Sequence, residues 1–483
     1  MHEIKNMVNE YKNGKNVGIF SVCCSNKYVI EAAMERLLDK NIPLLVEATA
    51  NQVDQFGGYT GMKPKDYFEY IHNIAEEVGF PKERIILGGD HLGPLTWKNI
   101  DAEKAMENSR ELIKQYVLAG FTKIHLDTSM PLKGDIENNI FGDDLIADRA
   151  AQLCKVAEEA YSELKETNKD AIHPVYIIGS EVPIPGGAQV EEEEEGMQVT
   201  KVKDFKNTAE TFKKTFEAYG LKDAFEYVVG IVVQPGVEFG SEDVWEYDRE
   251  AAKELSDALK DYPNLVFEAH STDYQSPKSL KKMVEDGFII LKVGPALTFG
   301  FREGAFALNA IENELLKYDS DVELSNFIEV LDYNMVKNPK EWMHHYSGNG
   351  LEIKLQRKYS LSDRARYYMP KEEVNYALEK LMDNLKDVNI PITLISQYMH
   401  EQYKKIRDGL LKPNAEALLK DRIGEYIDDY IWDKGEPQSK RHLGNPPYPF
   451  YQYPVNCYEH ILMLEILVNS YHFCLVFLQS IVL

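Results

Sequence analysis

Acidic and imidazole side chains stand where short apolar runs of this sequence end. Asp90 and His91 follow RIILGG, and His270 closes NLVFEAH. Glu181 ends VYIIGSE, and Gln234 ends VVGIVVQ. Imidazole combined with carboxylate oxygen is a usual ligand set for Zn²⁺ and related divalent ions. We therefore predict one divalent metal, zinc in the first place with Mn²⁺, Co²⁺ or Ni²⁺ as alternatives, held by His91, Glu181, His270 and Gln234.

Three carboxylates beside these ligands are candidates for proton transfer. Asp90 directly precedes His91, so its carboxylate could reach a substrate while the imidazole reaches the metal. Glu47 is the second-last residue of IPLLVEA, and Asp127 ends FTKIHLD. These two could orient ligands or bond to substrate hydroxyls. The alternative for each group is structural, such as capping of the following helix or hydrogen bonding within the core.

Four basic residues predict a phosphate site. Lys292 lies in FIILKVG, and Arg302 lies in the segment GPALTFGFREGAF that begins at its end. Arg364 and Arg366 lie in RKYSLSDRARYYM. Barrels often hold phosphate on the loops after their last strands and on a helix N-terminus. The alternative is a solvated basic helix start. Neither segment is a Walker loop, so an ATP-dependent kinase is not predicted.

The elements that must position these residues follow a regular alternation. Eight short, nearly continuous apolar runs alternate with longer segments of helical pattern, which is typical of parallel strands covered on both faces. The runs are residues 17–23, 42–48, 84–90, 121–127, 175–181, 228–234, 264–270 and 288–294. This order predicts an α/β fold, a (β/α)8 TIM-type barrel, over residues 1–300. A doubly wound sheet is the alternative, but CCSNKYVIEAAM after the first run lacks a glycine-rich phosphate turn.

After residue 300 the strand pattern stops. Residues 301–434 have a helical pattern, and we expect them to form a helical extension packed on the barrel. Residues 435–483 begin as a Pro/Tyr-rich linker and continue as the apolar segment ILMLEILVNSYHFCLVFLQSIVL. Glu465 and His472 interrupt that segment, so we expect a docked helix or a self-association segment in preference to a membrane anchor.

Composition limits the classes of partner. The chain has 54 Lys plus Arg against 79 Asp plus Glu, a formal net charge of -25. That balance repels nucleic acid and anionic membranes, and we expect neither as a partner. The five cysteines include no CxxC pair, and the N-terminal segment has no signal-peptide pattern. We therefore expect a cytoplasmic location.

Several segments also resemble one known family. They are VEATANQVDQFGGYTGMKPKDY, LGGDHLGP, KVGPALTFGFREGAFAL, HHYSGN, YSLSDRARYYM and ISQYMHEQY. In this order, within residues 1–430, they resemble the GatZ/KbaZ family. Its members are described as the non-catalytic subunit of class II tagatose-1,6-bisphosphate aldolase, and have also been labelled tagatose-6-phosphate kinase. The resemblance implies a role in tagatose, galactitol or N-acetylgalactosamine catabolism, with a catalytic aldolase subunit as partner and a phosphorylated ketohexose as ligand.

The family in turn resembles the class II aldolases themselves. By that resemblance Asp90 would handle the substrate hydroxyl proton, while His91 and His270 would bind zinc, with Glu181 as an acidic strand-five residue. Two departures stand out. Gln234 replaces a histidine ligand, and the Gly-Gly-Ser loop after the strand-seven histidine reads Ser271-Thr272-Asp273.

Two hypotheses about function follow. The first is an accessory, non-catalytic subunit that stabilises and activates a separate catalytic aldolase subunit. The alternative is a metal-dependent C4-epimerase of ketohexoses or their 6-phosphates, which uses retro-aldol and aldol steps at its own active site. The family description favours the first. The presence of Asp90, His91, Glu181 and His270 favours the second.

Overall fold

The computed structural model describes residues 2–182 and 198–431 of the 483 in the chain. These residues belong to one compact unit, Met1–Pro437. The predicted linker and apolar tail at 435–483 lie outside the described residues. In the part that is described, no helix is both long enough and apolar enough to cross a membrane.

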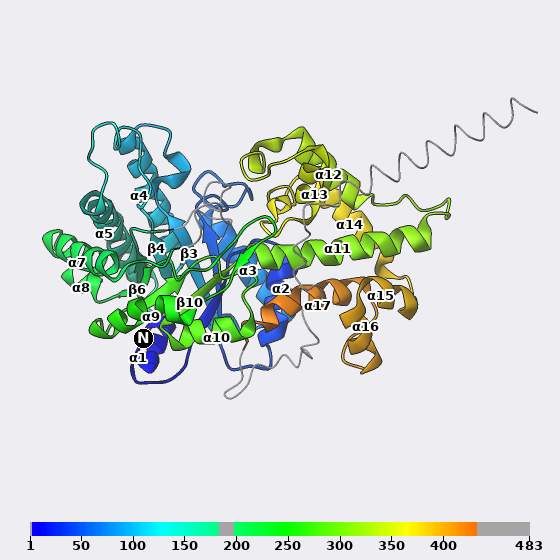
Figure 1. The fold of residues 1–483 in the computed structure, drawn as a ribbon, viewed down its shortest axis with the longest axis horizontal. Coiled ribbons are helices and arrows are strands. Elements are labelled where there is room, and N and C mark those ends of the chain that lie inside the picture. Colours follow the sequence, from blue (N-terminus) through cyan, green and yellow to red (C-terminus); the bar gives the residue numbers. More distant parts are fainter. Residues whose placement is uncertain (1, 183–197, 432–483) are drawn as a thin grey trace, which may run out of the picture. The chain divides into compact units, whose positions relative to one another are not determined.

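Eight parallel strands close into a barrel, as the sequence predicts (Figure 1). Around the barrel the order is β1-β10-β9-β6-β5-β4-β3-β2. The strands are β1 (Ile19–Val22), β2 (Leu44–Thr49), β3 (Ile85–Leu92), β4 (Lys123–Leu126), β5 (Val175–Ile178), β6 (Val228–Val232), β9 (Val266–Ala269) and β10 (Phe288–Val293). Each lies inside or overlaps one of the eight apolar runs. A short antiparallel pair, β7 (Glu238–Phe239) and β8 (Val244–Trp245), is inserted after β6.

Helices connect the strands and surround the barrel. They are α2 (Lys27–Leu37), α3 (Pro64–Val78), α4 (Ala102–Ala119), α5 (Asp143–Thr167), α7 (Val202–Ala218), α8 (Lys222–Phe225), α9 (Arg249–Ala258) and α10 (Pro277–Glu285). Their ends follow local sequence signals. Asp101 caps α4 through hydrogen bonds from two backbone amides, and Gly120 ends it in the left-handed conformation that suits glycine.

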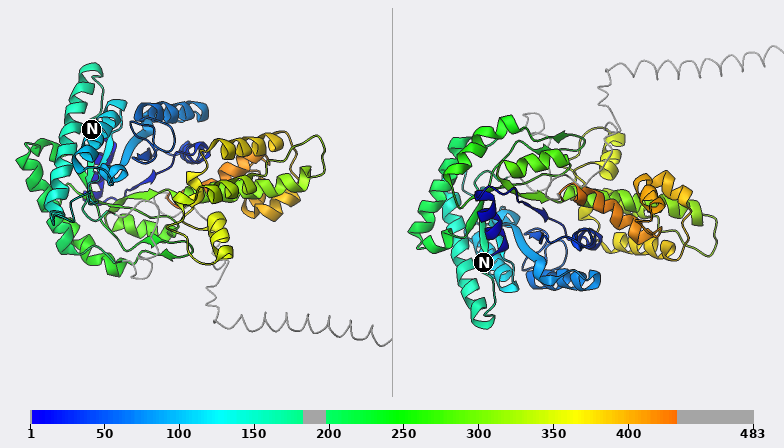
Figure 2. Two further views of the ribbon diagram at one scale, coloured as in Figure 1. Left: turned by 90° about the horizontal axis from the view of Figure 1, so that it is seen from above. Right: turned by 90° about the horizontal axis from the view of Figure 1, so that it is seen from below.

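A group of helices follows the last strand. They are α11 (Pro295–Leu316), α12 (Phe327–Lys337), α13 (Gly350–Tyr359), α14 (Glu372–Lys386), α15 (Ile392–Tyr398), α16 (His400–Arg407) and α17 (Ala415–Asp428). Both views in Figure 2 place the helices drawn in yellow to orange on one side of the barrel. An ion pair between Arg36 Nη2 of α2 and Asp421 Oδ1 of α17, 2.7 Å long, joins this group to the barrel helices. Helix α11 runs through residue 300, where the sequence suggests a domain boundary; that boundary stays a prediction.

The barrel interior is apolar at one end. Ile19, Leu45, Ile86, Val266 and Ile290 belong to one buried cluster within the ring of strands. Helix α1 (Glu3–Lys12) adds Ile4 and Val8 to the same cluster. Side chains alternate along a strand, so those two residues further along β1, β2, β9 and β10 have the same orientation; they are Ser21, Glu47, Glu268 and Lys292. The apolar end therefore supports a polar layer at the carboxyl ends of the strands.

Candidate metal centre and active site

A buried layer of charged side chains lies directly above the apolar end of the barrel. Its central residue is Lys123 of β4, whose Nζ lies 2.5 Å from Glu47 Oε1 of β2 and 2.7 Å from Glu268 Oε2 of β9. All three side chains are completely inaccessible to solvent. Ser21 Oγ of β1 donates a further hydrogen bond to Glu47 Oε2 at 2.6 Å. Four strands are thus joined by buried charge and hydrogen bonds.

The charges in this layer compensate one another. Burial alone would raise the pKa of Glu47, but the ammonium groups of Lys123 and Lys292 hold that pKa far below its usual range. Burial alone would lower the pKa of Lys123, and Glu268 and Glu47 raise it instead. Gly88 makes room for this arrangement, because a Cβ atom there would lie 2.8 Å from Glu47 Cγ. We infer that both carboxylates and the lysine are ionised.

Lys292 of β10 connects this layer to the residues above it. Its ammonium group forms an ion pair with Asp90 and lies 3.4 Å from Glu47 Oε2 and 3.7 Å from Glu268 Oε1. Three carboxylates therefore already surround this cation, which the sequence suggests for phosphate binding.

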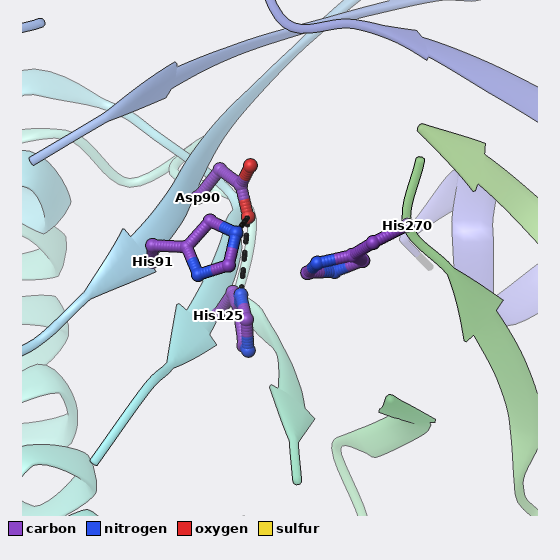
Figure 3. A group of neighbouring side chains, drawn as sticks. All are labelled: Asp90, His91, His125 and His270. Atoms are coloured by element: carbon purple, nitrogen blue, oxygen red, sulfur yellow. Dashed lines mark hydrogen bonds and ion pairs between the residues drawn. The ribbon is translucent and has the colours of Figure 1, made fainter. Parts of the chain in front are cut away.

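Four side chains above Lys292 form a group able to hold a metal ion (Figure 3). They are Asp90, His91, His125 and His270, and one potential ligand atom from each lies within 4.8 Å of those of the others. All four are buried. Figure 3 shows the Asp90 carboxylate next to the imidazoles of His91 and His125, with His270 facing them from the opposite side. Three imidazoles and a carboxylate suit Zn²⁺ or another divalent transition metal.

Neighbouring carboxylates fix how two of these imidazoles are oriented. His91 Nδ1 lies 2.7 Å from Asp127 Oδ2, and His270 Nε2 lies 2.9 Å from Glu268 Oε1. A carboxylate that accepts one ring N–H leaves the lone pair of the other nitrogen for a metal, as in many zinc sites. The histidines and carboxylates therefore fit a divalent ion.

The third imidazole supports the same conclusion. His125 Nδ1 lies 3.1 Å from Asp90 Oδ1, while its Nε2 is buried and has no hydrogen-bond partner among the described residues. Burial lowers the pKa of His125 and of His270 to about 4, so both are neutral near pH 7. A neutral imidazole is the form that binds metal.

An irregularity in β3 brings two consecutive residues into this group. The pairing of β3 with β4 shifts between Gly89 and Leu92, so β3 has one residue more than its partner there. His91 has a φ of 76°, which is unusual for a residue with a Cβ atom. In a regular strand Asp90 and His91 would point to opposite faces. The bulge lets both side chains face the same site.

Two predicted ligands lie elsewhere. Glu181 follows the end of β5, is exposed, and accepts a hydrogen bond of 2.7 Å from Thr200 Oγ1. Gln234 follows the end of β6, and its Oε1 accepts hydrogen bonds from the amides of Gly236 and Val237 at 2.8 and 3.1 Å. Among the described residues, the group formed by Asp90 and the three histidines does not include Glu181, and Gln234 Oε1 is engaged by the amides of its own turn.

His125 is the group member that the sequence analysis missed as a ligand. It lies inside β4, not at its end, and alternates with Lys123 and Asp127. Side chains alternate along a strand, so Lys123, His125 and Asp127 lie on one face of it. Following this alternation in the sequence would have identified His125 as an inward-facing residue. The same reading would have placed Lys123 and Glu268 on the inward faces of their strands.

A pocket opens above the metal-binding group. Asp90, His91 and His270 line it, together with Lys292 and, from the helical part, Arg366 and Tyr367. Arg366 donates to the carbonyl oxygens of Ser362 and Asp363 at 2.5 and 2.9 Å and to Tyr367 Oη at 3.0 Å. An arginine has five N–H donors, so these bonds leave further donors for a ligand.

The other two predicted phosphate ligands have structural contacts. Arg302 is buried, forms an ion pair of 2.6 Å with Asp363 Oδ1, and donates to the carbonyl oxygen of Lys358. Arg364 donates to Tyr367 Oη at 3.2 Å and contacts His345. Through these contacts Arg302 joins α11 to the segment that carries Arg366.

A family model and a solved structure match most of this chain. Residues 4–433 match the family model described as D-tagatose-1,6-bisphosphate aldolase subunit GatZ/KbaZ-like. A crystal structure from Sinorhizobium meliloti 1021, described as a probable tagatose 6 phosphate kinase, is 43% identical with a TM-score of 0.77. The match covers 86% of this chain and 99% of that one.

Two solved aldolases are much less similar. Fructose-bisphosphate aldolase of Campylobacter jejuni is 16% identical with a TM-score of 0.40, covering 80% of this chain and 95% of that one. The YdjI aldolase of Escherichia coli K12 is 12% identical with a TM-score of 0.36, covering 80% and 99%. Similarity at this level carries no information about function.

Proposed function

The chain belongs to the D-tagatose-1,6-bisphosphate aldolase subunit GatZ/KbaZ-like family, and we propose that it acts on phosphorylated ketohexoses at a metal site of its own. The reaction would break and re-form the bond between C3 and C4, so that the configuration at C4 is inverted. Tagatose 6-phosphate and fructose 6-phosphate are the natural pair, since they differ only at C4. The observation that carries this proposal is the buried group of Asp90, His91, His125 and His270 at the floor of a pocket.

Residues that line the pocket, and buried residues that contact them, have separate roles in this proposal. The three imidazoles would hold a divalent ion, with Asp90 beside it, and that ion supplies Lewis acidity toward the oxygens of the ketose when it is bound. Arg366, at the pocket wall, would bind the 6-phosphate through its remaining N–H groups. Asp127 and Glu268 keep His91 and His270 oriented. Glu47 and Lys123 fix Glu268 from below.

Asp90 is the candidate acid and base. Its carboxylate would take the proton from the C4 hydroxyl, whose oxygen then becomes the aldehyde oxygen as the C3–C4 bond breaks. The electron pair of that bond passes to the three-carbon ketose fragment as an enolate. After the aldehyde turns its other face, the enolate attacks it, and the re-formed C4 alkoxide takes the proton back from Asp90. Atoms and charge balance, and no oxidant is needed.

The second candidate is the accessory, non-catalytic subunit. The family description, which names a subunit of an aldolase, favours it. Exposed apolar side chains on α12 and α13 also favour a protein partner: Tyr333, Val336, Leu351, Leu355 and Tyr359 are each about half to two-thirds exposed. In this reading the partner is a catalytic tagatose-bisphosphate aldolase subunit, and the pathway is tagatose or galactitol catabolism.

The proposal also concerns kinase activity and the location of the protein. Kinase activity is not part of it, because the turn after β1 reads Cys23-Cys24-Ser25-Asn26 and lacks the glycines of a phosphate loop. We propose a cytoplasmic location, which the free thiols of Cys23, Cys24 and Cys154 support.

A test with purified full-length protein separates the two functions. The protein, alone, is incubated with tagatose 6-phosphate and Zn²⁺, Mn²⁺, Co²⁺ or Ni²⁺ in turn, and fructose 6-phosphate is followed by NMR. Formation of fructose 6-phosphate that stops when a chelator is added is the expected result. No turnover with any metal, together with stimulation of a separate aldolase subunit, would establish the accessory role instead.

A further inference from the structure

The start of helix α11 is a place where barrels often bind phosphate. The helix begins at Pro295, directly after β10, and both Gly294 and Pro295 line the pocket. The N-terminus of a helix of this length offers free amides and a positive dipole end to an anion. In many barrels the loops after the last two strands and a helix N-terminus form the phosphate site.

In this chain a side chain of the protein occupies that position. Asp273 Oδ1 accepts hydrogen bonds from the backbone amides of Gly294 at 3.0 Å and Ala296 at 2.8 Å. The carboxyl group is buried and lines the pocket. Burial raises the pKa of Asp273 to about 6, although the two amides and Arg366 act against that rise. Near pH 7 the group is therefore mostly a carboxylate.

The loop that carries Asp273 is held firmly. Thr272 Oγ1 donates to the carbonyl oxygen of Lys292 at 2.8 Å, and Tyr430 Oη donates to the carbonyl oxygen of Thr272 at 2.7 Å. Ser271 and Tyr274, on either side, adopt φ angles of 53° and 62°. These contacts fix the direction in which Asp273 points, so an incoming anion would have to displace a carboxylate whose loop is anchored at two points.

The remaining positive charge in the pocket suffices for one phosphate. Among the described residues that line it, the cationic side chains are Arg366 and Lys292. Lys292 is already surrounded by Asp90, Glu47 and Glu268. Arg366 is thus left to bind an anion, whereas a ketohexose 1,6-bisphosphate carries a phosphate at each end.

We propose that Asp273 is a specificity-determining residue: it occupies the anion position at the start of α11 and restricts the pocket to ketohexose monophosphates, excluding 1,6-bisphosphates. This inference rests on the proposed function and adds the substrate class to it. The carboxylate already accepts the two amide hydrogen bonds that a second phosphate would need. Its negative charge also repels that phosphate. The uncharged hydroxymethyl end of a 6-phosphate meets no such repulsion.

The test is the ratio of two affinities, measured by calorimetry with the full chain. We expect wild type to bind tagatose 6-phosphate about tenfold more tightly than tagatose 1,6-bisphosphate, because the Asp273 carboxylate occupies the amides at the start of α11 and repels a second phosphate. Asp273→Ala should shift the ratio toward the bisphosphate by about tenfold or more. Asp273→Asn keeps an acceptor for both amides and removes only the charge, so we expect a smaller shift in the same direction.

A matched control separates specificity from helix capping. Asp248 caps α9, accepting hydrogen bonds from the amides of Glu250 and Ala251. Asp248→Ala should lower stability and leave the ratio unchanged. An unchanged ratio in Asp273→Asn and in folded Asp273→Ala, or equal binding of both sugars by wild type, would overturn the inference and leave the proposed function standing. Failure of wild type to bind either sugar phosphate would overturn both.

Discussion

Asp90 and His91 are consecutive residues of β3, yet both side chains belong to the same metal-binding group. A strand bulge and a left-handed backbone at His91 make this possible. A residue with a Cβ atom in that conformation costs of order 1 kcal/mol or more, and such conformations cluster at functional sites. In the proposed mechanism, this placement puts the candidate proton-transfer group directly beside a candidate metal ligand.

The first prediction concerns the ligands themselves. His125→Ala should lose bound metal as completely as His91→Ala, because each removes one of three imidazoles. Elemental analysis of the purified proteins measures this directly. Glu181→Gln is the matched control and should keep its metal, since Glu181 contacts Thr200 and is exposed. Full metal content in His125→Ala, or its loss in Glu181→Gln, would contradict the assigned ligand set.

The same residues show how far the sequence predicts the site. All eight strands are predictable, because each is a short apolar run bounded by polar residues. The ligands are harder to predict, because placement depends on where each strand ends. Strand β5 ends at Ile178 and β6 at Val232, so Glu181 and Gln234 fall in the loops beyond.

Contacts between distant segments could not be predicted. Arg302 and Arg366 both lie in segments after the last strand. The structure pairs Arg302 with Asp363 and leaves Arg366 at the pocket wall. That difference depends on how the chain folds back after α13, and no local pattern encodes it. Asp273 is a similar case, because its role depends on the position of the α11 N-terminus.

The second prediction concerns the charged layer below the site. Lys123→Met removes the cation that lies closest to the buried Glu47 and Glu268, and should reduce the free energy of unfolding by about 3–5 kcal/mol. Urea unfolding of both proteins measures the loss. Lys104→Met removes an exposed ion pair with Glu107 and should change stability by less than about 1 kcal/mol. A loss no larger in Lys123→Met than in this control would show that the layer is not held by charge pairing.

The third prediction concerns how the free energy of unfolding depends on pH, and it is independent of the metal. His2 caps α1, since its Nδ1 accepts the amide hydrogen of Ile4 at 3.1 Å. Burial lowers the pKa of His2 from 6.5 to about 4. Between these values the unfolded chain takes up a proton that the folded chain does not. The free energy of unfolding should therefore fall as the pH falls through this range, by up to about 1.4 kcal/mol per unit.

The variant that tests this is His2→Asn. Asparagine caps helices well and does not titrate in this range. Urea unfolding at several pH values between 4 and 7 should give a smaller pH dependence for the variant than for wild type. Identical dependence in the two proteins would show that His2 is not the titrating group.

The central claim is that this chain catalyses C4 epimerisation at a site of its own, and Asp90→Asn tests that claim most directly. Asparagine keeps the size of the side chain and an oxygen near His125, but it cannot take up a proton. The three imidazoles remain to hold metal. We predict that Asp90→Asn retains its metal and a cooperative thermal transition, while conversion of tagatose 6-phosphate to fructose 6-phosphate falls by about 10²–10⁴-fold relative to wild type. Turnover in the variant equal to that of wild type would contradict the account.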